Sequence, residues 1–437
     1  MYPLCISMLS GFAMIFIDKI FLSRYSLDTL AAISSGGTLF WMVTGFFVYL
    51  ASIAGVYVGK LNGAGTLTNV AQPMWHMVIL SIISIPIFIL IAPALVNFFH
   101  STAQLNFYQK DYLICNYAYS PLMVMSSALS SFFIGLGMTS IVTYSGLIGN
   151  LVNVFLDYFL IFGIKDTLQP MGIKGAALAT GIGLFIQCAI MICAILSKKN
   201  NQTYNTRAFS FNIKIFWNMI KDGGASSIAL TIELLGWSAF YMMISKTTNT
   251  NALFASINQS IFIFFLFFSE ALEKSVSAIA GNLIGANNLQ ELKNLRYSAT
   301  KISLIFGVII ALLLVTFKSI IIKIFINDNS SMDINEYHIF YNLLTYSMPI
   351  LAIYITAENI RFLLKGLLVA MKNSLYIMIV EPICIWFFMV CPAYLFFNKL
   401  GLNIAFSLVL FTIFSIVTSV FLWIRLRNVE KNFFKLN

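Results

Sequence analysis

Polar side chains interrupt two stretches of this sequence that are otherwise strongly apolar. Asn150, Asn153 and Asp157 lie in the run Asn150-Leu-Val-Asn-Val-Phe-Leu-Asp157, and Asp18 lies in the run from Pro3 to Leu22. On a helix the first three residues fall at positions i, i+3 and i+7, so they form one polar stripe. An ionised carboxylate at bilayer depth costs roughly 2.5 to 3.5 kcal/mol on insertion scales, so it needs a partner, a bound cation or a proton. We therefore interpret Asp18, Asn153 and Asp157 as candidates for binding the ion that drives a transporter, and Asn150 as a residue that packs helices together.

The composition is typical of a polytopic membrane protein. Of the 437 residues, 59% are hydrophobic and 10% are charged, whereas soluble domains carry about 25% charged residues. The first apolar run shows neither a basic segment before it nor a small-residue cleavage site, so we do not expect a cleaved signal peptide. The cysteines lie in apolar segments and the histidines are far apart, which argues against a disulfide framework and a metal centre. The formal net charge of +10 does not indicate nucleic-acid binding, because the charges lie in loops between apolar runs.

The apolar runs have the length of membrane-spanning helices, which need about 20 residues each. They are too long for barrel strands, and only helices and closed barrels satisfy the backbone in lipid. The sequence therefore predicts an all-α integral membrane protein with twelve transmembrane helices. The predicted spans are 3–24, 34–58, 73–98, 111–136, 142–163, 173–196, 224–247, 252–279, 299–325, 339–369, 374–397 and 402–425.

The two halves of the chain resemble each other. The segment 58–65 (Val-Gly-Lys-Leu-Asn-Gly-Ala-Gly) follows the second span, and the similar segment 280–287 (Ala-Gly-Asn-Leu-Ile-Gly-Ala-Asn) follows the eighth. Repeats with an even number of spans insert the same way up, so we expect two parallel six-helix bundles around a central cavity. Their glycines also suit close packing of helices. The predicted domains are an N-lobe over 1–196, a cytoplasmic linker over 197–222 and a C-lobe over 223–437.

The distribution of basic residues predicts the orientation in the membrane. Lys and Arg are more frequent in the loops on the side of the N-terminus, for example Lys198, Lys199 and Arg425, than in the opposite loops. This favours both termini in the cytoplasm, and the expected location is the cell inner (plasma) membrane. The linker ends in 213–220, a candidate for an amphipathic helix at the membrane surface.

Several short motifs follow one another in a fixed order over nearly the whole chain. They are Phe16-Ile-Asp18 with Leu30-Ala-Ala32, the Gly-x-x-x-Gly-Ala turns at 59–64 and 281–286, Gly137-Met-Thr139, and the run 153–163 (Asn-Val-Phe-Leu-Asp-Tyr-Phe-Leu-Ile-Phe-Gly) followed by 170–180 (Pro-Met-Gly-Ile-Lys-Gly-Ala-Ala-Leu-Ala-Thr). In this order and spacing the chain resembles the multidrug and toxic compound extrusion (MATE) family.

The resemblance implies a cation site in the N-lobe, formed by the first, fifth and sixth helices. Carried over position by position, it consists of Asp18, Asn153, Asp157 and Thr180, with the backbone near Ala176. Two carboxylates and two neutral oxygens suit a dehydrated hard cation such as Na+. The two carboxylates could instead share a proton. The sequence leaves both ions open.

Charged residues in the C-lobe form a second group of candidates. Glu233 and Glu358 match acidic positions of the family, and both suit attraction of a cationic substrate or a second ion site. Gln259, Glu270 and Glu273 are candidates for a cavity wall. Basic residues break the family pattern at three places. Lys19 is a candidate partner of Asp18, and Lys274 is spaced to pair with Glu270. Arg361 and Lys365 follow Glu358 and favour a zwitterionic or anionic substrate.

The function expected from this resemblance is secondary antiport. A monomer without a cofactor would export an organic, amphipathic cation in exchange for Na+ or H+ by alternating access, with no nucleic-acid partner. The first alternative is a flippase for lipid-linked sugars, in which basic residues bind pyrophosphate. A polytopic membrane enzyme is a remote alternative, because neither H-E-x-x-H nor G-x-S-x-G occurs. A channel would not need paired acids in both lobes.

Overall fold

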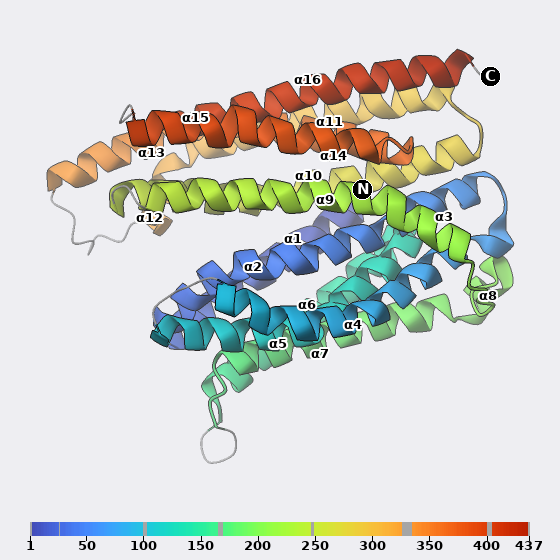
Figure 1. Ribbon diagram of the computed structural model, residues 1–437, viewed down its shortest axis with the longest axis horizontal. Coiled ribbons are helices and arrows are strands. Elements are labelled where there is room, and N and C mark those ends of the chain that lie inside the picture. The colour runs from blue at the N-terminus through green and yellow to red at the C-terminus, as the bar shows by residue number, and fades with distance from the viewer. Residues whose placement is uncertain are drawn as a thin grey trace. The chain divides into compact units, whose positions relative to one another are not determined.

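The computed structural model describes residues 2–25, 27–98, 103–164, 169–245, 249–325, 334–399 and 404–435, and these parts are almost entirely helical (Figure 1). The first part of the chain forms α1 (Tyr2–Tyr25), α2 (Leu27–Ser52), α3 (Ala54–Gly63), α4 (Gln72–Phe98), α5 (Ala103–Gly135), α6 (Thr139–Phe162), α7 (Ile173–Ile195) and α8 (Lys198–Tyr204). The second part forms α9 (Ile213–Ser245), α10 (Asn249–Gly285), α11 (Gln290–Thr316), α12 (Lys318–Phe325), α13 (Ile334–Ala370), α14 (Ser374–Ile385), α15 (Cys391–Ala393) and α16 (Phe406–Lys435).

Twelve helical segments of the described chain are long and apolar enough to cross a membrane, which confirms the predicted number. The second span, Phe40–Gly63, combines α2 and α3, and the eleventh, Ser374–Phe397, combines α14 with α15 and two π-helical segments. The segment 213–220 is helical and forms the first turns of α9, which therefore begins before the predicted seventh span. Asn212 begins this helix by accepting hydrogen bonds from the backbone N–H groups of Lys214 and Ile215 at 3.0 and 3.2 Å.

The described chain divides into two compact units. Unit 1 comprises Met1–Thr231, Ser277–Asn288 and Val369–Leu375, and unit 2 comprises Ile232–Val276, Leu289–Leu368 and Tyr376–Asn437. The predicted division into lobes 1–196 and 223–437 is based on the sequence repeat and not on contacts, and it stays a prediction.

The Gly-rich segments of the two halves pack directly on each other within unit 1. A Cβ atom at Gly59 would lie 2.6 Å from the carbonyl oxygen of Ala278, and one at Gly281 would lie 2.8 Å from that of Val56. Only glycine allows two helix backbones to approach this closely. The close-packing interpretation of these motifs therefore holds in the structure.

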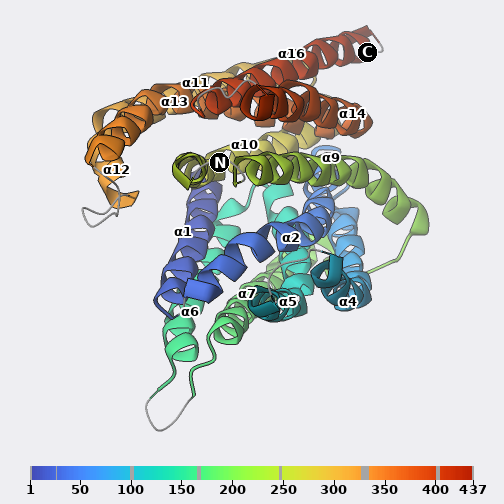
Figure 2. The same cartoon turned by 60° about the vertical axis from the view of Figure 1, so that its left-hand side comes forward.

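The same kind of contact fixes α6 against α7, which Figure 2 shows as neighbouring antiparallel helices. A Cβ at Gly149 would lie 2.7 Å from the carbonyl oxygen of Gly183, and a Cβ at Gly183 would lie 2.6 Å from that of Gly149. Asn153 lies one turn after Gly149 and Thr180 one turn before Gly183, so this crossing brings their side chains to the same place.

We expect the Gly183→Ala substitution to lower the free energy of unfolding by about 1 to 3 kcal/mol, because the two backbones must separate to admit the methyl group. Gly224→Ala in α9 is the matched control, since no heavy atom among the described residues lies within 4 Å of its added Cβ. The control should be neutral or up to about 1 kcal/mol more stable, from helix propensity. Denaturant titration of the purified chain measures both changes. Equal stability of the two variants would contradict a backbone contact at Gly183.

Unit 2 is held together by an aromatic core and by helices that run alongside one another, as α14 and α16 do in Figures 1 and 2. The ring of Trp237 lies 4.7 Å from that of Phe411, and the ring of Tyr354 lies 4.9 Å from that of Phe262. These contacts join α9, α10, α13 and α16. They place Glu233 one turn before Trp237 and Glu358 one turn after Tyr354 in a packed interior.

Candidate functional site

The structure brings together the side chains that the sequence predicts for the cation site in unit 1. Asp157 and Asn153 from α6 are fully buried, and Asp18 from α1 is half-buried. The Asn153 amide donates a hydrogen bond to the Thr180 hydroxyl at 3.2 Å, and this hydroxyl donates to the carbonyl of Ala176 at 2.9 Å. The amide nitrogen of Asn153 is thus held by α7.

Several oxygens of this group are buried hydrogen-bond acceptors without a donor among the residues described. The carboxyl groups of Asp18 and Asp157 interact with each other. Within the described part of the chain, no hydrogen-bond donor reaches Asp18 Oδ1, Asn153 Oδ1 or either carboxyl oxygen of Asp157, although all four atoms are buried. A buried acceptor without a donor costs about 1 to 3 kcal/mol, and more when it is charged. Oxygens arranged in this way fit a proton shared between the carboxyls or a hard cation.

Two tyrosines and an asparagine of α5 adjoin this group, and the sequence analysis missed them. Tyr119 lies close to Thr180 and to both carboxylates, and Tyr112 lies close to Asp18. Asn116 donates to the carbonyl of Tyr112 at 2.7 Å and accepts a hydrogen bond from the Tyr119 hydroxyl. Their spacing of four and three residues within the fourth span was the available signal. The side chain of Lys19, which we considered as a partner of Asp18, lies outside the described residues.

Asn150, the third residue of the polar stripe, has a packing role. Its amide donates to the Ser10 hydroxyl at 2.8 Å and so joins α6 to α1. Thr143, seven residues earlier, adds a second link by donating to the carbonyl of Pro3 at 2.5 Å. These contacts fix the part of α1 that precedes Asp18.

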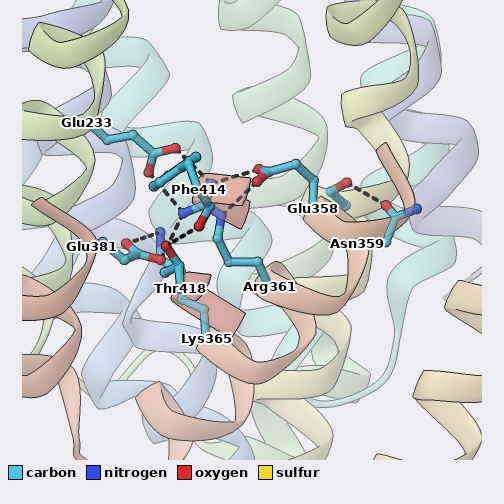
Figure 3. Close-up of polar contacts among 9 residues, drawn as sticks. Glu233, Glu358, Asn359, Arg361, Lys365, Glu381, Phe414 and Thr418 are labelled. Atoms are coloured by element: carbon cyan, nitrogen blue, oxygen red, sulfur yellow. Dashed lines mark hydrogen bonds and ion pairs between the residues drawn. The ribbon is translucent and has the colours of Figure 1, made fainter. Parts of the chain in front are cut away.

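Unit 2 contains a different arrangement of charge, centred on Arg361 of α13 (Figure 3). The predicted acids Glu233 and Glu358 meet at this guanidinium, and Glu381 of α14 joins them. Lys365 lies one turn after Arg361, and its Nζ is 3.5 Å from Glu381 Oε2. All five side chains are buried, which makes this a desolvated network of ion pairs.

The sequence analysis did not include Glu381, although the signal was present. It is an acid in the middle of the eleventh span and is followed by Pro382. Among the other candidates, Glu273 is buried and lies near Lys365, whereas Glu270 is partly exposed and forms an i,i+4 ion pair with Lys274 at 3.8 Å.

Gln259 is half-buried, and its role as a cavity residue stays a prediction. Its neighbour Asn258 is buried and joins α10 to α13, because it accepts a hydrogen bond from Ser347 at 3.2 Å. Its amide also donates to the carbonyl of Phe254 within α10 at 2.9 Å.

The profile of the MatE family matches residues 3–159 and 226–395, which is most of the chain. This chain belongs to the MATE family of transporters. It is a multi-pass membrane protein of the multidrug efflux type, as its helices and its relatives agree.

Curated relatives of this MATE chain carry the description "probable multidrug resistance protein NorM". The protein from Listeria innocua is 24% identical over 352 residues, which cover 78% of this chain and 76% of the relative. The protein from Thermotoga maritima is 24% identical over 390 residues, covering 87% of this chain and 80% of the relative.

Solved structures with the same fold include an outward-facing multidrug resistance MATE family transporter, at a TM-score of 0.85 and 17% identity over 98% of this chain and 95% of that one. A transporter of the MOP superfamily from Pyrococcus furiosus, described as having reverse polarity of the binding pocket, aligns at a TM-score of 0.85 and 17% identity over 98% of this chain and 94% of that one. At these identities the likeness concerns the fold, and it confirms the twelve-helix architecture.

Proposed function

We propose that this MATE transporter is a secondary antiporter that exports organic, amphipathic cations in exchange for Na+ or H+. It acts as a monomer in the cell inner membrane with both termini in the cytoplasm, and it uses no cofactor or nucleic-acid partner. The observation that carries the proposal is the set of buried oxygens on Asp18, Asn153 and Asp157 that no described donor satisfies.

The residues of unit 1 suggest how ion binding moves the transporter. A cation or proton at Asp18 and Asp157 removes the repulsion between the two carboxylates, and Asn153 and Thr180 supply neutral oxygens. Because Asp18 lies on α1 and Asp157 on α6, the charge at this contact changes which packing of α1 is favoured. One elementary charge that crosses about 100 mV yields roughly 2.3 kcal/mol, enough for about fiftyfold accumulation.

The surroundings of Arg361 disfavour an anionic substrate. All its N–H groups donate to carboxylates of Glu233, Glu358 and Glu381, so none is left for a pyrophosphate or another anion. Together with the family match, this disfavours the flippase alternative.

The proposal predicts that transport of ethidium into proteoliposomes follows an imposed ion gradient. We expect accumulation when a Na+ or a proton gradient is imposed separately, and its loss when an ionophore selective for that ion dissipates the gradient. The physical reason is that the gradient supplies the free energy at the two carboxylates. The control is a nucleotide: addition of ATP without a gradient should give no accumulation.

The gradient experiment can also refute the proposal. Ethidium movement that depends on neither ion gradient would show that the carboxylates do not couple ion entry to export, and accumulation that needs ATP would exclude secondary antiport.

A further inference from the structure

We propose that Arg361 is a resident counter-cation, which fills the carboxylate site of unit 2 so that this unit takes up no coupling ion. The number of ions exchanged per substrate is then set by the carboxylates of unit 1 alone. This inference deepens the proposed antiport and rests on it.

The first support is the number of hydrogen bonds at the guanidinium. Arg361 Nε donates to Glu358 Oε1 at 3.0 Å, Nη1 donates to Glu233 Oε2 at 3.2 Å and to Glu381 Oε1 at 3.0 Å, and Nη2 donates to Glu233 Oε1 at 2.7 Å and to Glu358 Oε2 at 2.8 Å. A guanidinium carries five N–H donors, so each donor has its own carboxylate oxygen. The acids come from three helices, α9, α13 and α14, and converge on this one cation (Figure 3).

The second support comes from the oxygens. Both oxygens of Glu233, both of Glu358 and Oε1 of Glu381 accept from Arg361, and Oε2 of Glu381 faces Lys365. Five of the six oxygens of these three acids therefore accept from the guanidinium, whereas Oε2 of Glu381 is paired with Lys365 without a hydrogen-bond donor among the described residues. A Na+ ion or a proton could bind at one of these five oxygens only by displacing Arg361.

Displacement of Arg361 is unfavourable for three reasons. A guanidinium does not lose its proton in proteins, so its charge is permanent. It is covalently attached beside its partners and therefore competes at a high effective concentration. Its side chain is 1% exposed and lies about 5 Å from the rings of Phe362 and Phe414, so leaving would expose paired charges in a dry interior.

Unit 1 differs in this respect. Its two carboxylates interact with each other, and among the side chains that the structure describes no Lys or Arg nitrogen lies within ion-pair distance of them. One unit thus holds acids with a built-in cation, and the other holds acids whose charge an external ion can balance. Because of this difference, the coupling ion binds to the residues of α1, α6 and α7 in unit 1.

The test is equilibrium binding of radioactive 22Na+ to the purified full-length chain at pH 7 and pH 8.5. It compares Asp157→Asn with the double variants Asp157→Asn/Arg361→Gln and Asp157→Asn/Arg361→Lys. Removing the guanidinium should create one additional saturable Na+ site per chain, because the freed carboxylates need a new cation. The lysine variant should gain none, since it still supplies the charge. Gel filtration identifies variants that remain folded.

Two results would overturn the proposal. The first is a folded glutamine double variant that binds no more Na+ than Asp157→Asn alone. The second result comes from the single variant Glu233→Gln, in which Arg361 is retained. It tests the proposal even if the Asp157→Asn/Arg361→Gln variant does not fold. This variant should keep the ratio of ions to substrate, measured from the gradients at which net flux reverses, and a lower ratio would mean that unit 2 takes up an ion. If Asp157→Asn leaves coupling intact, the proposed function of unit 1 fails, whereas the comparison at Arg361 still gives its own answer.

Discussion

Replacement of Asp157 with Asn is expected to abolish gradient-driven export while the chain stays folded. The substitution keeps the shape of the side chain but removes one of two buried carboxylates. Loss of one partner of a buried charge pair costs about 3 to 5 kcal/mol, so binding of the coupling ion should weaken at least roughly hundredfold. Stability should not fall, because the native carboxylate oxygens have no donor within the described chain and their charge is costly to bury. Ethidium accumulation in proteoliposomes and denaturant titration measure the two effects.

The matched control is Asp111→Asn, which makes the same chemical change at a more exposed acid. Asp111 forms a surface ion pair with Lys174 at 3.3 Å, and such pairs contribute about 0 to 1 kcal/mol. This variant should export ethidium at close to the wild-type rate. Wild-type coupling in Asp157→Asn, or equal loss in both variants, would contradict a specific role of Asp157.

The largest expected loss of stability follows from Arg361→Met. This substitution retains much of the apolar volume but leaves Glu233, Glu358 and Glu381 without their common partner. Breaking a buried ion pair by removing one member lowers the free energy of unfolding by about 3 to 5 kcal/mol. Titration of the purified chain from mild detergent into SDS measures this loss, and addition of Na+ should stabilise the variant more than the wild type, because the freed carboxylates offer an additional Na+ site.

Two comparisons separate this effect from general damage. Lys174→Gln removes a basic side chain that is 57% exposed, and it should change stability by about 1 kcal/mol or less. The double variant Arg361→Met/Glu233→Met should be less destabilised than the sum of its single variants, because they share one interaction. Additive effects would indicate that Arg361 and Glu233 do not stabilise each other.

The sequence predicted the fold because membrane insertion follows a local rule. Each span is recognised from its own length and apolar content, which needs no knowledge of its neighbours. The number of spans is confirmed, and the family is confirmed by a profile match over most of the chain. The start of the seventh span differs from its predicted position at 224, because Asn212 caps α9 and the helix begins at Ile213.

The predicted group of Asp18, Asn153, Asp157 and Thr180 came from two independent signals, buried polar residues and the family pattern, and the structure places these residues together. The α5 tyrosines were missed because a tyrosine in a span is common, and only the packing of α5 on α7 directs Tyr119 toward Thr180. Whether the group binds Na+ or H+ stays a prediction.

The sequence by itself determined that this is a twelve-helix MATE transporter with acidic residues inside its apolar spans. Hydropathy and the cost of burying a charge can be read from each segment without its neighbours. Only the tertiary structure decided which of those acids already have a cation. Arg361 could have paired along α13 with Glu358 alone, since three residues separate them. Its bonds to Glu233, 128 residues away, and to Glu381, 20 residues away, depend on how α9, α13 and α14 pack. The partners of a buried charge come from helices that are distant in the sequence, so no local sequence pattern shows which of them will meet.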